Sequence, residues 1–277
     1  MKHNIPTFKY LFLSLLLLTL PILLLVLRLQ PHNLHRTAAT AVVTTHNNIL
    51  PVIQPESQQE TETNTSSGED IRIRPGYTSY EAYLERQVNK TNNPRLRQLW
   101  TTRDWDRKIQ VFSQVFQQMK RQNLLTNGSK ALCIGARVGQ EVEALKRVGV
   151  SDSVGIDLVP FPPLVVKGDF HNQPFGDDTF DFEFSNVFDH ALYPRKFVSE
   201  IERTLRPGGV CVLHVAISRR TDKYSANDLY SVKPLVAMFR RSKLVHVKEV
   251  DGFGANTEVV FRKRQKGSPA HPTVPVD

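Results

Sequence analysis

The sequence predicts an α/β domain with a mostly parallel β-sheet, helices on both of its faces, and a membrane-spanning helix ahead of it. Three observations support this prediction. Apolar segments alternate with helical segments from Ala131 onward, the first of these segments ends in a turn at Gly135, and eighteen uncharged residues run from Tyr10 to Leu27. Alternating strands and helices are typical of a parallel sheet covered on both faces. A length of 277 residues suits one such domain with appendages.

The apolar run from Tyr10 to Leu27 predicts an uncleaved signal anchor at residues 10–29. At about 1.5 Å per residue, a helix of this length nearly crosses the hydrocarbon core of a bilayer. A cleaved signal peptide is the alternative, but its apolar region would be shorter and small residues would follow it directly. Here Arg28 follows the run, and the nearest A-x-A pattern lies downstream at Ala39–Ala41.

The charges on either side of the anchor predict its orientation. The N-terminal side carries the α-amine, Lys2 and Lys9, whereas the other side carries Arg28 and Arg36. This slight excess favours a cytoplasmic location for residues 1–9 and places the large domain across the membrane. We therefore expect a single-pass type II membrane protein in the Golgi or another secretory compartment. Three N-x-S/T triplets fit a lumenal domain.

Composition divides the rest of the chain into four parts. Residues 30–70 are rich in Thr, Gln and Asn and predict a flexible stem, because they bury too little apolar surface to fold. Residues 71–128 predict a helical extension, residues 129–264 the α/β domain, and residues 265–277 a disordered tail. The net charge is −1 up to residue 70 and +10 beyond it. A basic domain attracts anionic partners, but a membrane-anchored one is not expected to bind nucleic acid.

Hydrophobic periodicity predicts two helices before the sheet, the second beginning at a capping Asp104. Helices are expected at Tyr80–Val88, Asp104–Asn123, Gln140–Val148, Pro194–Leu205 and Val232–Arg241. Strands are expected at Ala131–Ile134, Ser153–Ile156, Leu164–Val166, Phe180–Ser185, Val210–Val215, Val245–Val250 and Thr257–Arg262. The last two strands are expected to close the domain as a pair.

The two cysteines lie on the first and fifth of these strands, as Cys133 and Cys211. In the expected sheet another strand separates them, and two strand spacings amount to about 9.5 Å. A disulfide needs Cα atoms within about 7 Å of each other. Both residues are therefore expected to be buried free thiols.

Residues suited to binding a nucleoside follow successive strands. Gly135 follows the first strand, Asp157 ends the second, Asp169 and Phe170 follow the third, and Asn186 follows the fourth. Parallel sheets bind ligands beyond the carboxyl ends of their strands. A glycine turn lets the backbone approach a ligand, and the free amides at a helix start favour an anionic group. The first carboxylate can accept ribose hydroxyls, and the second can accept an adenine amine while the phenyl ring packs on the base.

With these segments in this order, the chain resembles the class I S-adenosylmethionine-dependent methyltransferases. More narrowly, it resembles the methyltransferase-11 type and a plant group of single-anchor methyltransferase-like proteins. The resemblance runs from about Lys130 to Lys263. It rests on Gly155–Asp157, Gly168–Phe175, Asp178–His190 and Leu205–Gly209.

The resemblance implies a Rossmann-like sheet, mostly parallel with an antiparallel last strand, and S-adenosyl-L-methionine as cofactor. It implies a binding set formed by the glycine loop and the ends of the next three strands: Gly135, Ala136, Arg137, Gly139, Asp157, Leu158, Asp169, Phe170 and Asn186. The loop departs from the family pattern at two positions. Cys133 stands where the family has an acid, and Arg137 stands where it has a glycine. Arg137 could cover the methionine carboxylate or obstruct the pocket.

Three histidines are candidates for a catalytic role. His190 could be a general base near the acceptor or could shape its pocket. His214 is expected to be packed within a strand, and His171 to lie in an exposed loop. No His/Cys cluster has the spacing of metal ligands, so no metal is expected.

We therefore expect a membrane-anchored methyltransferase that acts on a small-molecule or glycan acceptor. A catalytically inactive, methyltransferase-like interaction module is the alternative, because fold does not imply function. A nicotinamide oxidoreductase is a weaker reading, since the loop from Gly135 to Gly139 lacks the G-x-G-x-x-G spacing. The sequence leaves the acceptor and the oligomeric state open.

Overall fold

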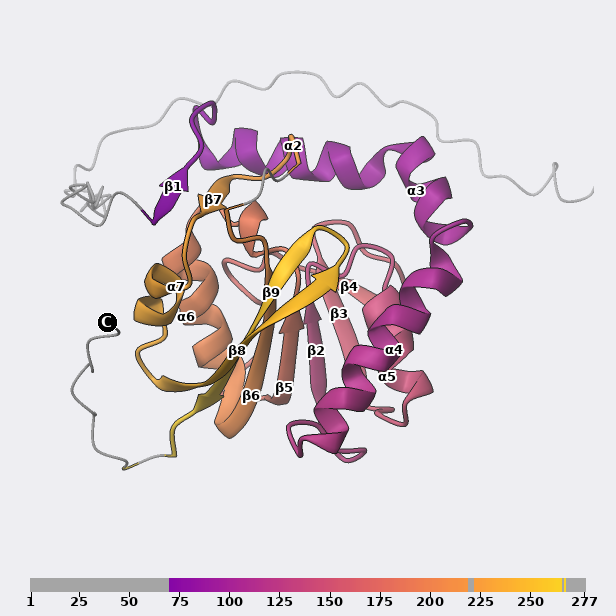
Figure 1. Cartoon of the computed structure of the whole chain (residues 1–277). Helices are drawn as coiled ribbons and strands as arrows, with labels where there is room; N and C mark the ends of the chain where they lie inside the picture. Colours follow the sequence, from indigo (N-terminus) through magenta and orange to yellow (C-terminus); the bar gives the residue numbers. More distant parts are fainter. Residues whose placement is uncertain (1–69, 219–221, 266, 268–277) are drawn as a thin grey trace, which may run out of the picture. The chain divides into compact units, whose positions relative to one another are not determined.

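The computed structural model describes residues 70–218, 222–265 and 267 (Figure 1). All of them fall within one unit, Thr61–Asp277. The predicted anchor at residues 10–29, the stem up to residue 69 and most of the predicted tail lie outside the described residues. Within the described ranges, no helix is both long and apolar enough to cross a bilayer.

A seven-stranded sheet in the order β4-β3-β2-β5-β6-β9-β8 forms the centre of the domain (Figure 1). Only β9 runs antiparallel to its neighbours, β6 and β8, and the other pairs are parallel. The prediction of a mostly parallel sheet with an antiparallel last strand is therefore confirmed. The strands are β2 (Ala131–Ile134), β3 (Ser153–Asp157), β4 (Val165–Lys167), β5 (Phe180–Ser185), β6 (Leu205–Val215), β8 (Ser242–Gly252) and β9 (Ala255–Lys263).

Helices cover both faces of this sheet, as Figure 1 shows. On one face lie α4 (Trp105–Arg121) and α5 (Gln140–Arg147), and on the other lie α6 (Pro194–Thr204) and α7 (Lys233–Met238). Strand β2 serves both cores, because successive strand side chains point to opposite faces. Ala131 and Cys133 pack in the α4–α5 core, whereas Leu132 and Ile134 pack in the α6–α7 core.

The two cysteines lie as predicted, on strands that have β5 between them. Cys133 pairs in register with Phe184 of β5, and Cys211 pairs with Glu183 of the same strand. Both are buried free thiols, and burial raises the pKa of each thiol well above its ordinary value.

The extension before the sheet contains more structure than its sequence pattern predicted. Helix α2 (Tyr80–Asn92) is followed by α3 (Pro94–Thr101), which was not expected. The Asn93 side chain caps α3 by accepting a hydrogen bond from Leu96 N at 3.1 Å, and Pro94 occupies its first turn. At the start of α4, the predicted cap is wrong. Asp104 makes no side-chain capping bond and instead pairs with Arg103 at 3.0 Å.

The sequence also did not predict a second sheet, which has two strands. β1 (Ile71–Ile73) pairs antiparallel with β7 (Asn227–Leu229), far away in the sequence. Arg72 and Arg74 reinforce this pairing through Asp228, at 2.8 and 2.6 Å. A strand of three residues is too short to show an alternation of apolar and polar side chains. The sequence therefore carries no local pattern that predicts the pairing of these two distant segments. Residues 71–128 are thus not purely helical.

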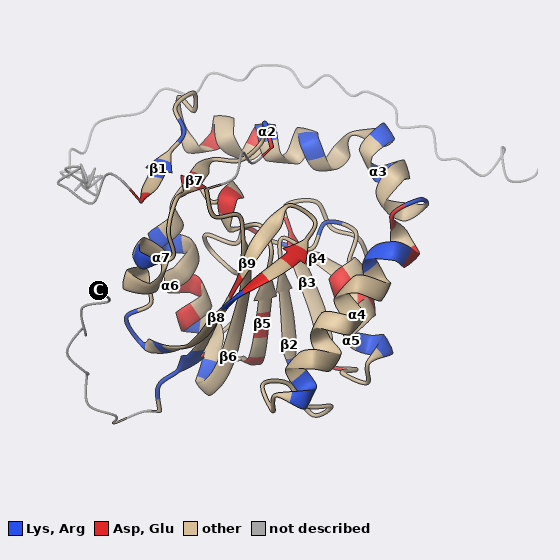
Figure 2. Cartoon of the chain, viewed as in Figure 1, with Lys and Arg blue, Asp and Glu red and all other residues tan. Residues whose placement is uncertain are grey.

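Basic residues gather where β8 begins and β9 ends, as the blue segments of Figure 2 show. The two segments are paired, with Lys243 opposite Arg262 and Ser242 opposite Lys263. Because β8 runs parallel to β6, this basic end corresponds to the amino ends of the parallel strands. It therefore lies away from the edge at which parallel sheets bind ligands.

Candidate active site

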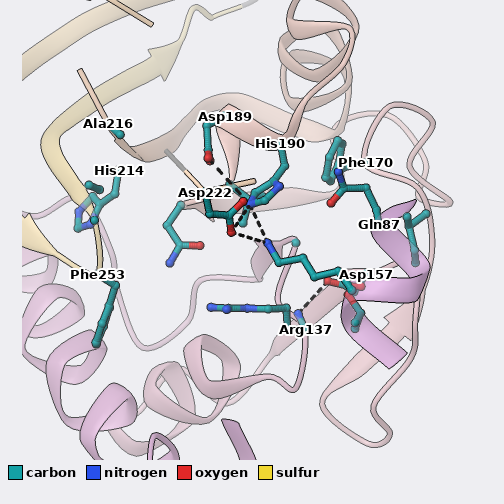
Figure 3. Close-up of a pocket in the computed structure, with 18 of the residues that line it drawn as sticks. Gln87, Arg137, Asp157, Phe170, Asp189, His190, His214, Ala216, Asp222 and Phe253 are labelled. Carbon is teal, nitrogen blue, oxygen red and sulfur yellow. Dashed lines mark hydrogen bonds and ion pairs between the residues drawn. The ribbon is translucent and has the colours of Figure 1, made fainter. Parts of the chain in front are cut away.

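A cavity of about 300 Å³ lies at the carboxyl ends of the parallel strands (Figure 3). It adjoins the point between β2 and β5 where the strand order of the sheet reverses, which is the usual ligand site of such folds. Helix α2 contributes Tyr83, Gln87 and Lys90 to its wall, and the tip of the β8–β9 hairpin contributes Phe253 and Gly254. Segments from across the whole described sequence therefore meet around one space.

Most of the sequence-predicted binding residues line this cavity. They are Gly135, Arg137, Asp157, Leu158, Phe170 and Asn186, and the catalytic candidate His190 lines it as well. Ala136, Gly139 and Asp169 do not form part of the wall. The predicted set thus divides into residues that face the cavity and residues that support it.

The two loop glycines have different tasks. Gly135 has a φ of +73°, and a Cβ atom there would lie 2.3 Å from Val187 Cγ2, so only glycine fits this turn. Gly139 has a φ of +84° at the start of α5, and a Cβ atom there would lie 2.6 Å from Leu164 Cβ. Gly139 therefore allows α5 to pack closely on the sheet, rather than touching a ligand.

Asp157 connects the end of β3 to the glycine loop. Its carboxylate accepts hydrogen bonds from Arg137 N at 2.9 Å and from Val159 N at 3.2 Å. Burial raises the pKa of this carboxyl, although the two backbone bonds oppose that effect. Each carboxylate oxygen can accept more than one hydrogen bond, so Asp157 can hold the loop and still receive ligand hydroxyls.

Asp169, predicted to accept an adenine amine, lies outside the cavity wall and bonds to other parts of the protein. Its Oδ2 accepts a hydrogen bond from Tyr80 Oη on α2, and its Oδ1 accepts one from His171 N at 2.8 Å. The expectation that His171 is exposed is wrong. Its ring is buried, lies 2.9 Å from Tyr80 Oη through Nδ1, and packs among aromatic side chains.

Arg137 adopts a left-handed backbone, with φ of +50°. Its guanidinium lies over the Trp100 ring, 5.1 Å from the centroid, and thus along the wall of the cavity (Figure 3). Its Nε is buried and has no hydrogen-bond partner among the described residues. Arg137 therefore lines the cavity and carries one buried donor without a partner among the described residues.

His190 has protein partners at both ring nitrogens. Nδ1 lies 3.1 Å from the Tyr224 carbonyl, which can only accept, so Nδ1 carries the proton. Nε2 then accepts from Lys90 Nζ at 3.1 Å, and Lys90 also reaches Asp222 Oδ2 at 3.0 Å. Burial lowers the pKa of both His190 and Lys90. A role for His190 as a base stays a prediction, and it would require the Lys90 ammonium to move first.

His214 is buried, as expected, yet it also lines the cavity. Its Nε2 lies 2.9 Å from Glu258 Oε2, and Glu258 also accepts from His246 at 3.0 Å and from Lys248 at 2.8 Å. Burial alone would raise the pKa of Glu258, but the hydrogen bonds from these three groups outweigh it and lower the pKa to about 2. A histidine held by an ionised carboxylate is a common arrangement for a general base.

Sequence reasoning missed the residues that α2, α4 and the β8–β9 hairpin bring to the cavity. One of them left a signal. Lys108 lies four residues before Phe112 and eight before Phe116, on the apolar face of α4. A charged residue at such a position points either to a buried ion pair or to a ligand site. Phe253 left none, because a hairpin tip carries no periodic pattern.

Comparison with known proteins agrees with this geometry. The family described as "Methyltransferase domain" matches residues 132–213. One similar solved structure is Burkholderia thailandensis 1,6-didemethyltoxoflavin-N1-methyltransferase with bound 1,6-didemethyltoxoflavin and S-adenosylhomocysteine. The two sequences are 16% identical and the TM-score is 0.53. The match covers 70% of this chain and 95% of that chain. A SAM-dependent methyltransferase from Aquifex aeolicus is 20% identical, and the match covers 53% of this chain and 87% of that chain. Its TM-score is 0.42. No curated protein matches significantly.

The matched residues 132–213 include the glycine loop, the ends of β3, β4 and β5, and the carboxylate at Asp157. The structural match supports the fold of the sheet around them. The centre of this chain, residues 132–213, therefore matches the methyltransferase-domain family in sequence, and its sheet has the fold of a solved methyltransferase.

Proposed function

We propose that the chain binds S-adenosylmethionine in the cavity described above and transfers its methyl group to a small-molecule acceptor. One observation supports this proposal most directly. Gly135, Asp157, Phe170 and Asn186 follow four different strands of the parallel sheet and line one cavity. That juxtaposition is what an adenosine with an attached amino acid requires.

The side chains of the cavity fit this cofactor. Asp157 has spare acceptor capacity for ribose hydroxyls, and Phe170 offers a ring for adenine. Arg137, which stands where the family has a glycine, lines the cavity, and its guanidinium suits the methionine carboxylate. When bound, the cofactor supplies an electrophilic methyl group on its sulfonium.

The protein then has to align the acceptor with that methyl group and exclude water. Proximity and orientation contribute about 7–11 kcal/mol at best. Helix α2 covers the cavity, with Tyr83 donating a hydrogen bond to the His190 carbonyl at 2.9 Å. His214, which lines the cavity and lies 2.9 Å from Glu258, is the group that we assign to take a proton from an acceptor hydroxyl or amine.

We also propose that residues 10–29 anchor the chain in a membrane as a type II protein of the Golgi or another secretory compartment. The support is the uncharged run of the sequence and its flanking charges. A glycan acceptor would suit such a compartment. Protease protection of intact vesicles tests the orientation, and a protease-sensitive domain would contradict it.

Calorimetric titration of the full chain with S-adenosylhomocysteine tests the proposed cofactor. We expect saturable heat from the wild type and binding about 100-fold weaker by Asp157→Ala. A wild-type chain that binds neither S-adenosylhomocysteine nor S-adenosylmethionine would contradict the proposal.

A non-catalytic interaction module is the second candidate, and one observation favours it. Asp169, the expected adenine acceptor, is held by Tyr80 of the extension. Thermal shift separates the two candidates, because only a cofactor-binding protein gains stability from S-adenosylhomocysteine.

A further inference from the structure

Lys108 is a buried cation that the proposed function has not used. It lies on α4, is only 7% exposed, and lines the cavity. Its ammonium lies 4.9 Å from the centroid of the Phe253 ring. Among the described residues it forms neither an ion pair nor a side-chain hydrogen bond. The nearby Glu141 does not satisfy it, since both Glu141 carboxylate oxygens are buried without a hydrogen-bond partner.

The surroundings of Lys108 disfavour its charge. Burial is the largest effect and lowers its pKa to about 8, and the nearby Arg137 lowers it further, while Glu141 and Asp104 act in the opposite direction. A buried ammonium without a hydrogen-bonding anion is strongly unfavourable. The other cavity lysine, Lys90, shows the contrast, because it is paired with Asp222 at 3.0 Å. Glu141 and Asp104 therefore lie near enough to favour the charge of Lys108, but among the described residues no carboxylate pairs with it.

The position of Lys108 distinguishes the acceptor from the cofactor. Figure 3 shows His214, Ala216 and Phe253 on one side of the cavity, and Asp157 and Phe170 on the other. Since Lys108 lies against Phe253, it belongs to the side with His214. Arg137 is the group assigned above to the methionine carboxylate, so the charge of Lys108 is available for a second anion.

We propose that Lys108 is the anion-binding group of the acceptor site, and that the acceptor is a small organic acid. Its carboxylate lies against the Lys108 ammonium, and its apolar part lies on the Phe253 ring. This inference rests on the proposed function, because it names the class of acceptor for the same cavity. It assigns Lys108 to binding and leaves open which atom of the acid receives the methyl group.

Ligand-observed NMR on the full chain, saturated with S-adenosylhomocysteine, tests the proposal with benzoate and its neutral isostere benzamide. We expect binding of benzoate, and at least about tenfold weaker binding of benzamide. Lys108→Met should abolish the difference, whereas Lys108→Arg should retain it. Arg107→Met is the matched control, because Arg107 also lies over Phe253, at 5.5 Å, but its side chain is 64% exposed and pairs with Asp104.

Each failure has a distinct meaning. Equal binding of benzoate and benzamide, absence of benzoate binding, or benzoate binding that survives Lys108→Met would overturn the inference. A tenfold loss of S-adenosylhomocysteine affinity in Lys108→Met, with benzoate binding unchanged, would assign Lys108 to the cofactor instead. If the wild type binds no S-adenosylhomocysteine, the proposed function fails, and the preference for the acid is then measured on the free protein.

Discussion

The two sides of the cavity are assembled in different ways. On the cofactor side, Gly135, Asp157 and Phe170 each follow a parallel strand closely. On the acceptor side, Lys108 comes from a helix of the extension, and Phe253 from a hairpin about 145 residues further along. The first side needs only the sheet to form, because parallel strands deliver their ends to one edge. The second side needs the extension and the hairpin to pack against that edge.

This difference also separates rigid from adjustable contacts. Gly135 has no room for a single added carbon, whereas a Cβ at Gly254 on the hairpin tip would meet nothing within 4 Å. The turn at Gly135 is therefore fixed by close packing, whereas Gly254 is exposed at the tip of the hairpin.

The largest effect is expected from Asp157→Ala on the cofactor side. The change removes the acceptor for Arg137 N and Val159 N as well as the proposed ribose contact. S-adenosylhomocysteine should bind about 100-fold more weakly, equivalent to roughly 3 kcal/mol, as measured by calorimetry. Asp157→Asn, which keeps one carbonyl acceptor, should lose less. Unchanged affinity in Asp157→Ala would break the assignment of this side to the cofactor.

A matched pair of glycine substitutions compares the two sides directly. Gly135→Ala adds a clash 2.3 Å from Val187 to a left-handed backbone and should cost about 2–3 kcal/mol of unfolding free energy. Gly254→Ala strains a similar backbone, with φ of +101°, without any clash, and should cost about 1 kcal/mol. Urea denaturation measures both. Equal losses would mean that the two sides are packed alike.

Glu258→Gln probes the charged support of His214 on the acceptor side. The carboxyl has a pKa of about 2 in the folded chain and 4.5 as its reference value. Its stabilising effect is therefore present above pH 4.5 and is lost as the pH falls toward 2. The variant should be less stable near neutral pH by about 1.5 kcal/mol. Its melting temperature should also fall less steeply than that of the wild type between pH 4.5 and pH 2. The same pH dependence of melting temperature in both proteins would contradict the role of the Glu258 carboxylate in holding His214.

The smallest expected effect comes from Tyr80→Phe, at the contact between the extension and the cofactor side. Loss of the hydroxyl frees Asp169 Oδ2 to accept the adenine amine. S-adenosylhomocysteine affinity should rise by about threefold to tenfold, at most about 1.4 kcal/mol. Tyr193→Phe is a suitable control, because its ring stacks on Tyr80 but its hydroxyl does not contact Asp169. Weaker binding by Tyr80→Phe would contradict the idea that Tyr80 competes with adenine for Asp169.

Much of the sheet followed from local pattern, and the errors lie where pattern is absent. The strands β2 to β6 and the free cysteines were predicted because apolar runs and glycine turns are local signals. Strand β1 was not predicted because it is only three residues long. Helix α3 was not predicted because it begins after a single residue that follows α2. His171 was misjudged because its partner Tyr80 lies 91 residues away, and Asp104 because its carboxylate pairs with the neighbouring Arg103 instead of capping the helix.

The cofactor side could be read from the chain alone, since each of its residues stands at a fixed offset from a strand and the sheet converts these offsets into proximity. The acceptor side could not. The position of Lys108 beside Phe253, and the contact of Tyr80 with Asp169, depend on how helices and a hairpin pack over the sheet edge. Packing of that kind follows from the sum of many weak contacts between distant residues, which no local spacing records.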